Sequence, residues 1–230
     1  MPGIFALRQL IPTRLTTSST AQNPLNSSLD GALNTMAWKQ ARIFEGLGYH
    51  VTVGAVTTPI VGGGNGTVYD LEQSEGVVSV PAGRTIIPIR VSVQLQQPLL
   101  ATDSDETEVM IAVDRLAVST AAGGTGTVET IFNMRTDNPQ SSLCTAVSAN
   151  TSDHNTPTLG LELARSVNVG DVNGTPGFAA FNTKHELVYE PETPPLLVGP
   201  CALYVYWGGT VATSGFAQLQ WIEIPTPPVS

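Results

Sequence analysis

The chemically active side chains that gather most closely in this sequence are carboxylates. Residues 103–108 read Asp-Ser-Asp-Glu-Thr-Glu, and carboxylates at alternating positions can collect oxygen ligands around a hard cation such as calcium. The segment lacks the central glycine of an EF-hand loop, and the last ligand position of such a loop would fall on Asp114, inside an apolar run. We therefore interpret residues 103–108 as a solvated turn between two strands, and we predict no metal ion and no cofactor.

The residue types that usually carry catalysis show no spacing that assembles a site. His50, His154 and His185 stand far apart, with no cysteine near them in sequence, which disfavours a zinc site. The chain contains no Gly-x-Ser-x-Gly motif, and a pair of carboxylates for glycoside hydrolysis could be drawn from any chain with 19 acidic residues. The sequence therefore predicts no catalytic residue and no enzyme activity.

The two cysteines and the two glycine-rich segments are also interpreted as structural. Cys144 and Cys201 do not make a disulfide framework, and we expect two reduced thiols within β-structure, with a single bridge as the alternative. Residues 62–66 and 123–126 lack the Lys-Ser/Thr ending of a phosphate-binding loop. We interpret both glycine-rich segments as loops between strands.

Aromatic residues concentrate near the end of the chain and suggest a binding surface. In the run 203–207 a strand would place Tyr204 and Tyr206 on one face and Trp207 on the other. Large aromatic side chains are enriched in protein interfaces, so we predict that Tyr204, Tyr206 and Trp207 contact another subunit. The alternative is that exposed aromatic rings stack on sugars, as in a carbohydrate-binding module.

These residues must be positioned by strands, because helical patterns are almost absent after Tyr49. Apolar Ile87, Ile89, Val91, Val93 and Leu95 alternate with polar residues and Pro88, and the proline predicts an edge strand or a bulge. Without crossover helices, parallel βαβ units are excluded, and an all-β antiparallel jelly-roll β-sandwich is predicted. The other expected strands cover residues 49–58, 76–80, 108–118, 127–135, 143–149, 159–164, 186–190, 203–207 and 216–224.

The chain is expected to divide into an N-terminal arm (1–48), the sandwich (49–225) and a short tail (226–230). Residues 1–28 are small, polar and rich in helix breakers, so they can bury little apolar area. A short helix is expected within residues 29–45, where apolar residues partly follow a period of 3.6.

Charge distinguishes the arm from the body. The formal net charge is −9, yet residues 1–42 hold four bases against Asp30 alone, a net charge of +3. Such an arm could dock on an acidic partner surface or simply be solvated. We predict docking through Arg8, Arg14, Trp38 and Arg42. The acidic total disfavours nucleic acid as a partner. No run reaches the roughly 18 to 20 apolar residues of a membrane span, and no signal peptide is expected.

Two segments of the body resemble those of structural proteins in tailed-phage virions. They are VVSVPAGRTIIPI at residues 77–89 and PLLVGPCALYVYW at residues 195–207, followed by QLQWIEIP at residues 218–225. The resemblance covers residues 49–225 and not the arm. It implies a jelly-roll decoration, cement or minor capsid protein that is made in the host cytoplasm and located in the virion, with no catalytic residue.

From the residues and the resemblance together, we expect a structural virion protein that only binds. Its partners would be the major capsid protein or other virion proteins and its own copies, arranged as a trimer. Many small contacts repeated by symmetry would then supply the affinity. The second alternative is a carbohydrate-binding receptor module on the same particle, and the third is a hydrolase with an unrecognised site.

Overall fold

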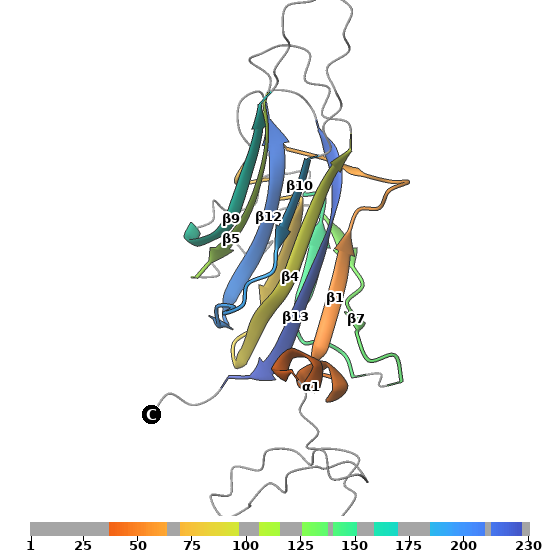
Figure 1. Ribbon diagram of the computed structural model, residues 1–230, viewed down its shortest axis with the longest axis vertical. Helices are drawn as coiled ribbons and strands as arrows, with labels where there is room; N and C mark the ends of the chain where they lie inside the picture. The colour runs from red at the N-terminus through yellow and green to blue at the C-terminus, as the bar shows by residue number, and fades with distance from the viewer. Residues whose placement is uncertain are drawn as a thin grey trace, which may run out of the picture. The chain divides into compact units, whose positions relative to one another are not determined.

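The computed structural model describes residues 37–63, 70–96, 106–115, 126–137, 140–150, 159–169, 185–209 and 213–226. These residues form an antiparallel two-sheet sandwich and one short helix, which confirms the predicted all-β sandwich (Figure 1). The helix, α1 (Trp38–Phe44), lies within the range 29–45 in which a helix was expected. The sandwich belongs to a compact unit that begins at Arg42.

Each sheet is built from strands that are distant in sequence. The seven-stranded sheet has the order β10 (His185–Tyr189), β4 (Arg84–Gln96), β13 (Ser214–Pro225), β1 (Gly48–Val53), β7 (Phe132–Asn133), with β11 (Leu197–Val198) on β4 and β2 (Ile60–Val61) on β13. The six-stranded sheet has the order β6 (Thr127–Glu129), β8 (Thr145–Ser148), β3 (Gly76–Val80), β12 (Cys201–Gly209), β5 (Glu106–Asp114), β9 (Leu159–Val169).

The longer strands pair in a nested pattern. The innermost antiparallel pair is β5 with β9, and around it β4 pairs with β10, β3 with β12 and β1 with β13. The chain therefore follows the course of one long hairpin, folded so that its four strand pairs divide between two sheets. As a result, β12 and β13 lie inside the sheets, each with a long strand on both sides.

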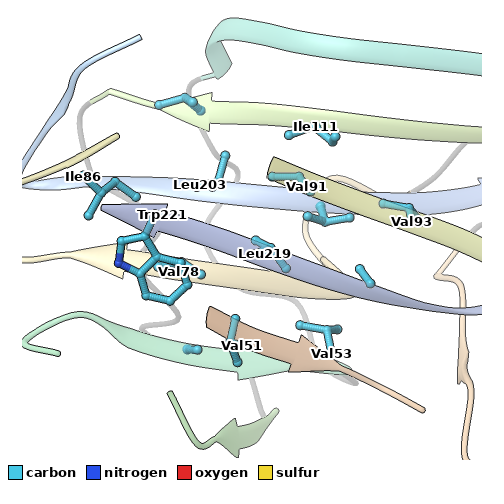
Figure 2. Close-up of a cluster of buried hydrophobic side chains, with 14 of the residues drawn as sticks. Val51, Val53, Val78, Ile86, Val91, Val93, Ile111, Leu203, Leu219 and Trp221 are labelled. Carbon is cyan, nitrogen blue, oxygen red and sulfur yellow. The ribbon is translucent and has the colours of Figure 1, made fainter. Parts of the chain in front are cut away.

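The main hydrophobic core fills the space between the two sheets (Figure 2). The predicted alternation in β4 is confirmed from Val91 to Leu95, where Val91, Val93 and Leu95 point into this core. Before the bulge of β4 it is wrong, because Ile86 and not Ile87 belongs to the core. Trp207 of β12 and Trp221 of β13 have no exposed surface and fill it from opposite sheets. Each fully buried large apolar side chain contributes about 1.5–3 kcal/mol to folding, so this contact area is the main stabilising feature of the sandwich.

Pro88 lies at a bulge, as its place in the alternating run predicted. Gln220 pairs with Arg90 but Trp221 pairs with Pro88, so Ile89 is the extra residue of β4. The alternative of an edge strand is wrong, because β4 has partners on both sides. On the side away from β13, Pro88 falls between the residues that pair with β11 and those that pair with β10, so its missing N–H interrupts no strand pairing there.

His185 joins the two sheets along one side of the sandwich. It lies in β10 of the seven-stranded sheet, while its ring nitrogens reach two strands of the six-stranded sheet. Nδ1 is 2.9 Å from Thr107 Oγ1 of β5, and Nε2 is 2.9 Å from Ser166 Oγ of β9. Burial lowers the pKa of His185 from its usual value of 6.5, because the charged form is poorly solvated there.

This lowered pKa predicts a pH-dependent contribution of His185 to stability. As the pH falls below 6.5, the histidine of the unfolded chain takes up a proton before His185 of the folded protein does. The stabilising contribution of His185 is therefore complete above pH 6.5 and decreases as the pH falls from 6.5 to the lowered pKa of the folded protein. We expect His185→Gln to cost about 1–3 kcal/mol at neutral pH, and this cost to shrink towards pH 5. Urea unfolding of both proteins at several pH values measures the difference, and a cost that does not change with pH would contradict the prediction.

Candidate functional site: the clamp at the end of helix α1

The predicted docking residues fall in two groups. Arg8 and Arg14 lie outside the described residues. Trp38 and Arg42 lie in α1, where Trp38 keeps 43% of its surface exposed and Arg42 forms an ion pair of 2.8 Å with Glu45. Trp38 is therefore available for a contact, whereas the charge of Arg42 is partly satisfied within its own segment.

Helix α1 ends in a glycine-dependent cap. Gly46 has a φ of 79°, in the left-handed region that favours glycine. Its N–H donates to the carbonyl of Ile43 at 2.9 Å, and the N–H of Leu47 donates to the carbonyl of Arg42 at 3.0 Å. These two hydrogen bonds form a Schellman motif, which turns the chain directly from α1 into β1.

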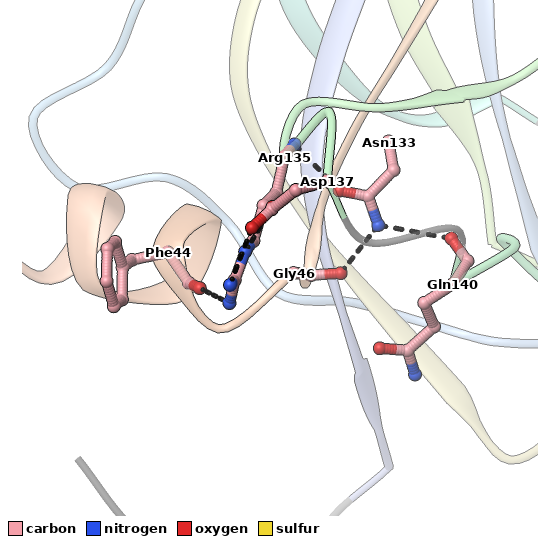
Figure 3. A network of polar contacts seen from close by, with 6 residues as sticks. All are labelled: Phe44, Gly46, Asn133, Arg135, Asp137 and Gln140. Atoms are coloured by element: carbon pink, nitrogen blue, oxygen red, sulfur yellow. Dashed lines mark hydrogen bonds and ion pairs between the residues drawn. The ribbon is translucent and has the colours of Figure 1, made fainter. Parts of the chain in front are cut away.

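None of the residues of α1 is fully buried, although Ile43 is half-buried and its side chain lies against Gly48 of β1. A helix this short is marginal by itself, so contacts with the sandwich must support it. Most of these contacts form a polar network that we call the α1 clamp, made of Phe44, Gly46, Asn133, Arg135, Asp137 and Gln140 (Figure 3).

Arg135 is the centre of the α1 clamp. Its Nη1 donates to the carbonyl of Phe44 at 2.7 Å, and its guanidinium carbon lies 5.2 Å from the centroid of the Phe44 ring. Asp137 holds the guanidinium with two hydrogen bonds, of 2.7 and 3.1 Å. This hydrogen bonding lowers the pKa of Asp137. A cation at the C-terminal end of a helix is also favourable, because the helix dipole is negative there.

Asn133 connects the turn after α1 with the loop that follows β7. Its amide nitrogen donates to the carbonyls of Gly46 at 2.8 Å and Gln140 at 3.1 Å, and its Oδ1 accepts the N–H of Arg135 at 2.8 Å. Both amide hydrogens are used, so the side chain is fixed in one orientation. The clamp therefore sets where the chain enters the sandwich.

Exposed apolar side chains occur on the elements next to the α1 clamp. Phe44 keeps 43% and Phe132 of β7 keeps 55% of its surface exposed. His50 of β1 stacks on Phe132, with ring centroids 5.5 Å apart. Val128 of β6 and Leu143, just before β8, are exposed as well. Phe44 and Phe132 offer apolar area to a partner beside α1 and β7 of the seven-stranded sheet, whereas Val128 and Leu143 do so at the β6 and β8 end of the six-stranded sheet.

The residues predicted for subunit contact are inside the protein, which corrects that prediction. Tyr204, Tyr206 and Trp207 have no exposed surface. The two tyrosine rings stack 5.6 Å apart, and the Tyr206 hydroxyl donates to the carbonyl of Leu71 at 3.1 Å. Trp207 lies in the main core. The strand alternation separated the two faces correctly, but the tyrosine face also packs inside the chain, in a cluster that includes Leu71.

Cys144 and Cys201 are both free and buried, in agreement with the expected thiols. Cys201 pairs with Val80, and Cys144 lies one residue before the Thr145–Ser79 pair, so β3 separates them. Two strand spacings amount to about 9–10 Å, beyond the roughly 7 Å limit between Cα atoms in a disulfide. Burial raises the pKa of Cys201 to about 11 and that of Cys144 further, which makes both thiols poor nucleophiles.

Comparisons with known proteins add no family assignment. No protein-family model matches the chain, and no curated protein matches it significantly. Within the described ranges, no group of three or more His, Cys, Asp or Glu side chains could hold a metal ion. In the same ranges, no helix has the length and apolar character needed to cross a membrane. His154 and residues 103–105 of the acidic segment lie outside the described residues. Residues 106–108 begin β5, where Thr107 and Glu108 are buried, so the interpretation of this half of the segment as a solvated turn is wrong.

The α1 clamp predicts that Arg135 controls the attachment of α1 and has little effect on the sandwich. We expect Arg135→Ala to leave the thermal unfolding of the body nearly unchanged, because the network is at the surface. Trypsin should then cut after Lys39 and Arg42 roughly five- to tenfold faster, since cleavage follows local opening.

The matched control is Arg90→Ala, which removes an exposed arginine from β4. This variant should be cut at Lys39 and Arg42 at the wild-type rate. Equal cleavage of the wild-type protein and the Arg135→Ala variant would show that the clamp does not hold the helix.

Proposed function

We propose that this protein is a structural component of a bacteriophage virion, of the decoration, cement or minor capsid type. It binds capsid subunits and its own copies and catalyses no reaction. The observation that carries the proposal is the α1 clamp, in which the sandwich holds the end of a helix through polar contacts and fully buries none of the helix's side chains.

This attachment suits a protein that presents its N-terminal segment to a partner. The clamp fixes the C-terminal end of α1 to the body, while Trp38 stays exposed on the helix. The residues before Arg42 include the bases Arg8, Arg14 and Lys39 against Asp30 alone, which favours an acidic partner surface. A segment anchored to the body binds at a raised effective concentration once the body is docked.

The nested strand pairing supports the jelly-roll topology that the resemblance to virion proteins implies. A jelly roll has eight strands in two Greek keys. Numbering the eight longer strands in chain order pairs the first with the eighth, the second with the seventh, the third with the sixth and the fourth with the fifth. We infer that the sandwich is a jelly roll on this basis.

Contact between copies is proposed for Phe132, which is exposed next to the α1 clamp, and for Val128, which is exposed on the edge strand β6, and no longer for the aromatic residues of β12. We retain a trimer as the expected assembly. The same burial of Tyr204, Tyr206 and Trp207 removes the stacking surface of the carbohydrate-binding alternative. No observation on the described residues favours the hydrolase alternative.

The virion role predicts that the full-length chain is found in mature particles and assembles in solution. We expect mass spectrometry of purified virions to detect the protein at a stoichiometric level. Sedimentation of the purified chain should give a mass near three times 24.2 kDa, and Phe132→Asp should shift it to the monomer. A chain that stays monomeric and is missing from particles would refute the proposal.

Docking through the N-terminal segment predicts a charge-dependent contact. In the full-length chain, Arg8→Glu combined with Arg14→Glu should weaken binding to particles roughly tenfold or more at low salt, because each substitution reverses a charge. Arg90→Glu makes one such charge reversal on β4 of the body and should leave binding within about twofold. Equal binding of all three proteins in co-sedimentation would exclude docking through Arg8 and Arg14.

A further inference from the structure

Glu75 is a buried carboxyl at the end of the sandwich where β12 leads towards β13. It keeps only 2% of its surface exposed and stands directly before β3. The pairing of β3 with β12 stops at Gly76 and Val205. Just beyond that point, Glu75 Oε2 accepts the backbone N–H of Trp207 at 2.9 Å. The carboxyl therefore takes the place of a neighbouring strand for this part of β12.

The other carboxylate oxygen holds a segment that crosses between the sheets. We call residues 60–63 the strap. The N–H of Gly63 donates to Glu75 Oε1 at 2.5 Å, and the N–H of Gly62 donates to the carbonyl of Thr213 at 2.8 Å. The carbonyl of Ile60 accepts the indole N–H of Trp207 at 3.2 Å.

The strap lies directly against the backbone of Trp207. A Cβ added to Gly62 would collide with the Trp207 carbonyl oxygen, so only glycine permits this approach. The strap begins in β2, which pairs with β13 of the seven-stranded sheet, and reaches Glu75 at the edge of β3 in the six-stranded sheet. Glu75 thus fixes a connection between the two sheets at this end.

The charges around Glu75 do not favour its ionised form. Asp70, on the segment before Glu75, raises the pKa of Glu75 further. Tyr206 of β12 is another titratable group that interacts electrostatically with Glu75. The N–H groups of Gly63 and Trp207 favour the carboxylate, but burial outweighs them and raises the pKa of Glu75 to about 8. Among the described residues, no lysine or arginine contributes to this shift.

We propose that Glu75 is a pH-sensitive latch, in which lifting of the strap from β12 is coupled to loss of the Glu75 proton to water. The closed strap keeps the carboxyl away from solvent and neutral. The open strap exposes it to water, where it ionises as an ordinary glutamate does. The strap is therefore held most tightly in acid and loosens as the pH rises. The inference does not depend on a role in the virion.

The sign and size of the effect follow from proton linkage. In the open state the carboxyl has the usual pKa of 4.5, and in the closed state the value is about 8. Between these values opening releases a proton, so its equilibrium constant increases by up to about tenfold for each pH unit. Above pH 8 both states are ionised and the dependence ends.

The test is hydrogen exchange of the full-length chain from pH 5.5 to 8.5, expressed as protection factors that remove the intrinsic effect of pH. The Gly62 and Gly63 amides should lose at least tenfold in protection between pH 5.5 and 8. Amides in the middle of β5 and β12, such as Ile111 and Val205, should keep theirs. Strap protection that stays constant in the wild-type protein would overturn the proposal, whether or not any variant folds.

Two variants sharpen this test. Glu75→Gln keeps the shape of the side chain but cannot ionise, so the protection of Gly62 and Gly63 should no longer change with pH. Glu190→Gln makes the same substitution at an exposed position after β10 and should keep the full wild-type dependence. An unchanged dependence in Glu75→Gln would assign the opening to another group and overturn the latch.

Discussion

The pairing of the first long strand with the last is the constraint on which the rest of this structure depends. The pair β1–β13 joins residues 48–53 to residues 217–222, across most of the chain. β13 also pairs with β4, and β12 pairs with both β3 and β5. The last two strands, β12 and β13, therefore supply inner strands of both sheets, together with Trp207 and Trp221. Neither sheet is complete until the C-terminal residues are in place, and such non-local pairing is slow to form.

Two buried polar side chains, His185 and Glu75, help to join the sheets, and burial favours the neutral form of each. His185 links β10 to β5 and β9, and burial lowers its pKa. Glu75 links the strap to β12, and burial raises its pKa. The two groups therefore act on stability in opposite directions as the pH changes. The contribution of His185 to stability grows as the pH rises from its lowered pKa to 6.5, whereas the contribution of Glu75 decreases as the pH rises from 4.5 to about 8.

Local sequence patterns predicted the positions of the strands well. They predicted poorly which strand faces are buried by other segments of the chain. The alternation from Ile87 to Leu95 predicted β4, and Pro88 predicted its bulge, because both signals lie within a few neighbouring residues. The burial of Tyr204 and Tyr206 could not be predicted in this way, since it involves the distant residue Leu71. Period-2 patterns show that a strand has two faces, but not which segments elsewhere in the chain cover them.

The contacts of the α1 clamp and of Glu75 were missed for a related reason, since they are made by polar side chains with ordinary local sequence. In the sequence, the clamp residues Asn133, Arg135 and Asp137 look like the polar residues of any solvated loop. Only the two-residue spacing between them hints that they share one face. Gly46 was the stronger signal, because a glycine after a helical pattern predicts a cap. In the sequence, Glu75 is a single acidic residue directly before the apolar run 76–80. Its burial depends on the strap, which comes from a separate part of the chain.

The α1 clamp and the strap show how segments are joined to this sandwich without becoming part of its core. In both, a side chain near a strand end binds backbone groups of another segment: Arg135 binds a helix carbonyl, and Glu75 binds two amides. Contacts of this kind are directional, and the apolar area that accompanies them is small: Ile43 of α1 and Ile60 of the strap are only partly buried. A body that contacts a particle surface gains from this arrangement, because an anchored segment can bind a neighbour with a smaller loss of entropy than a free one.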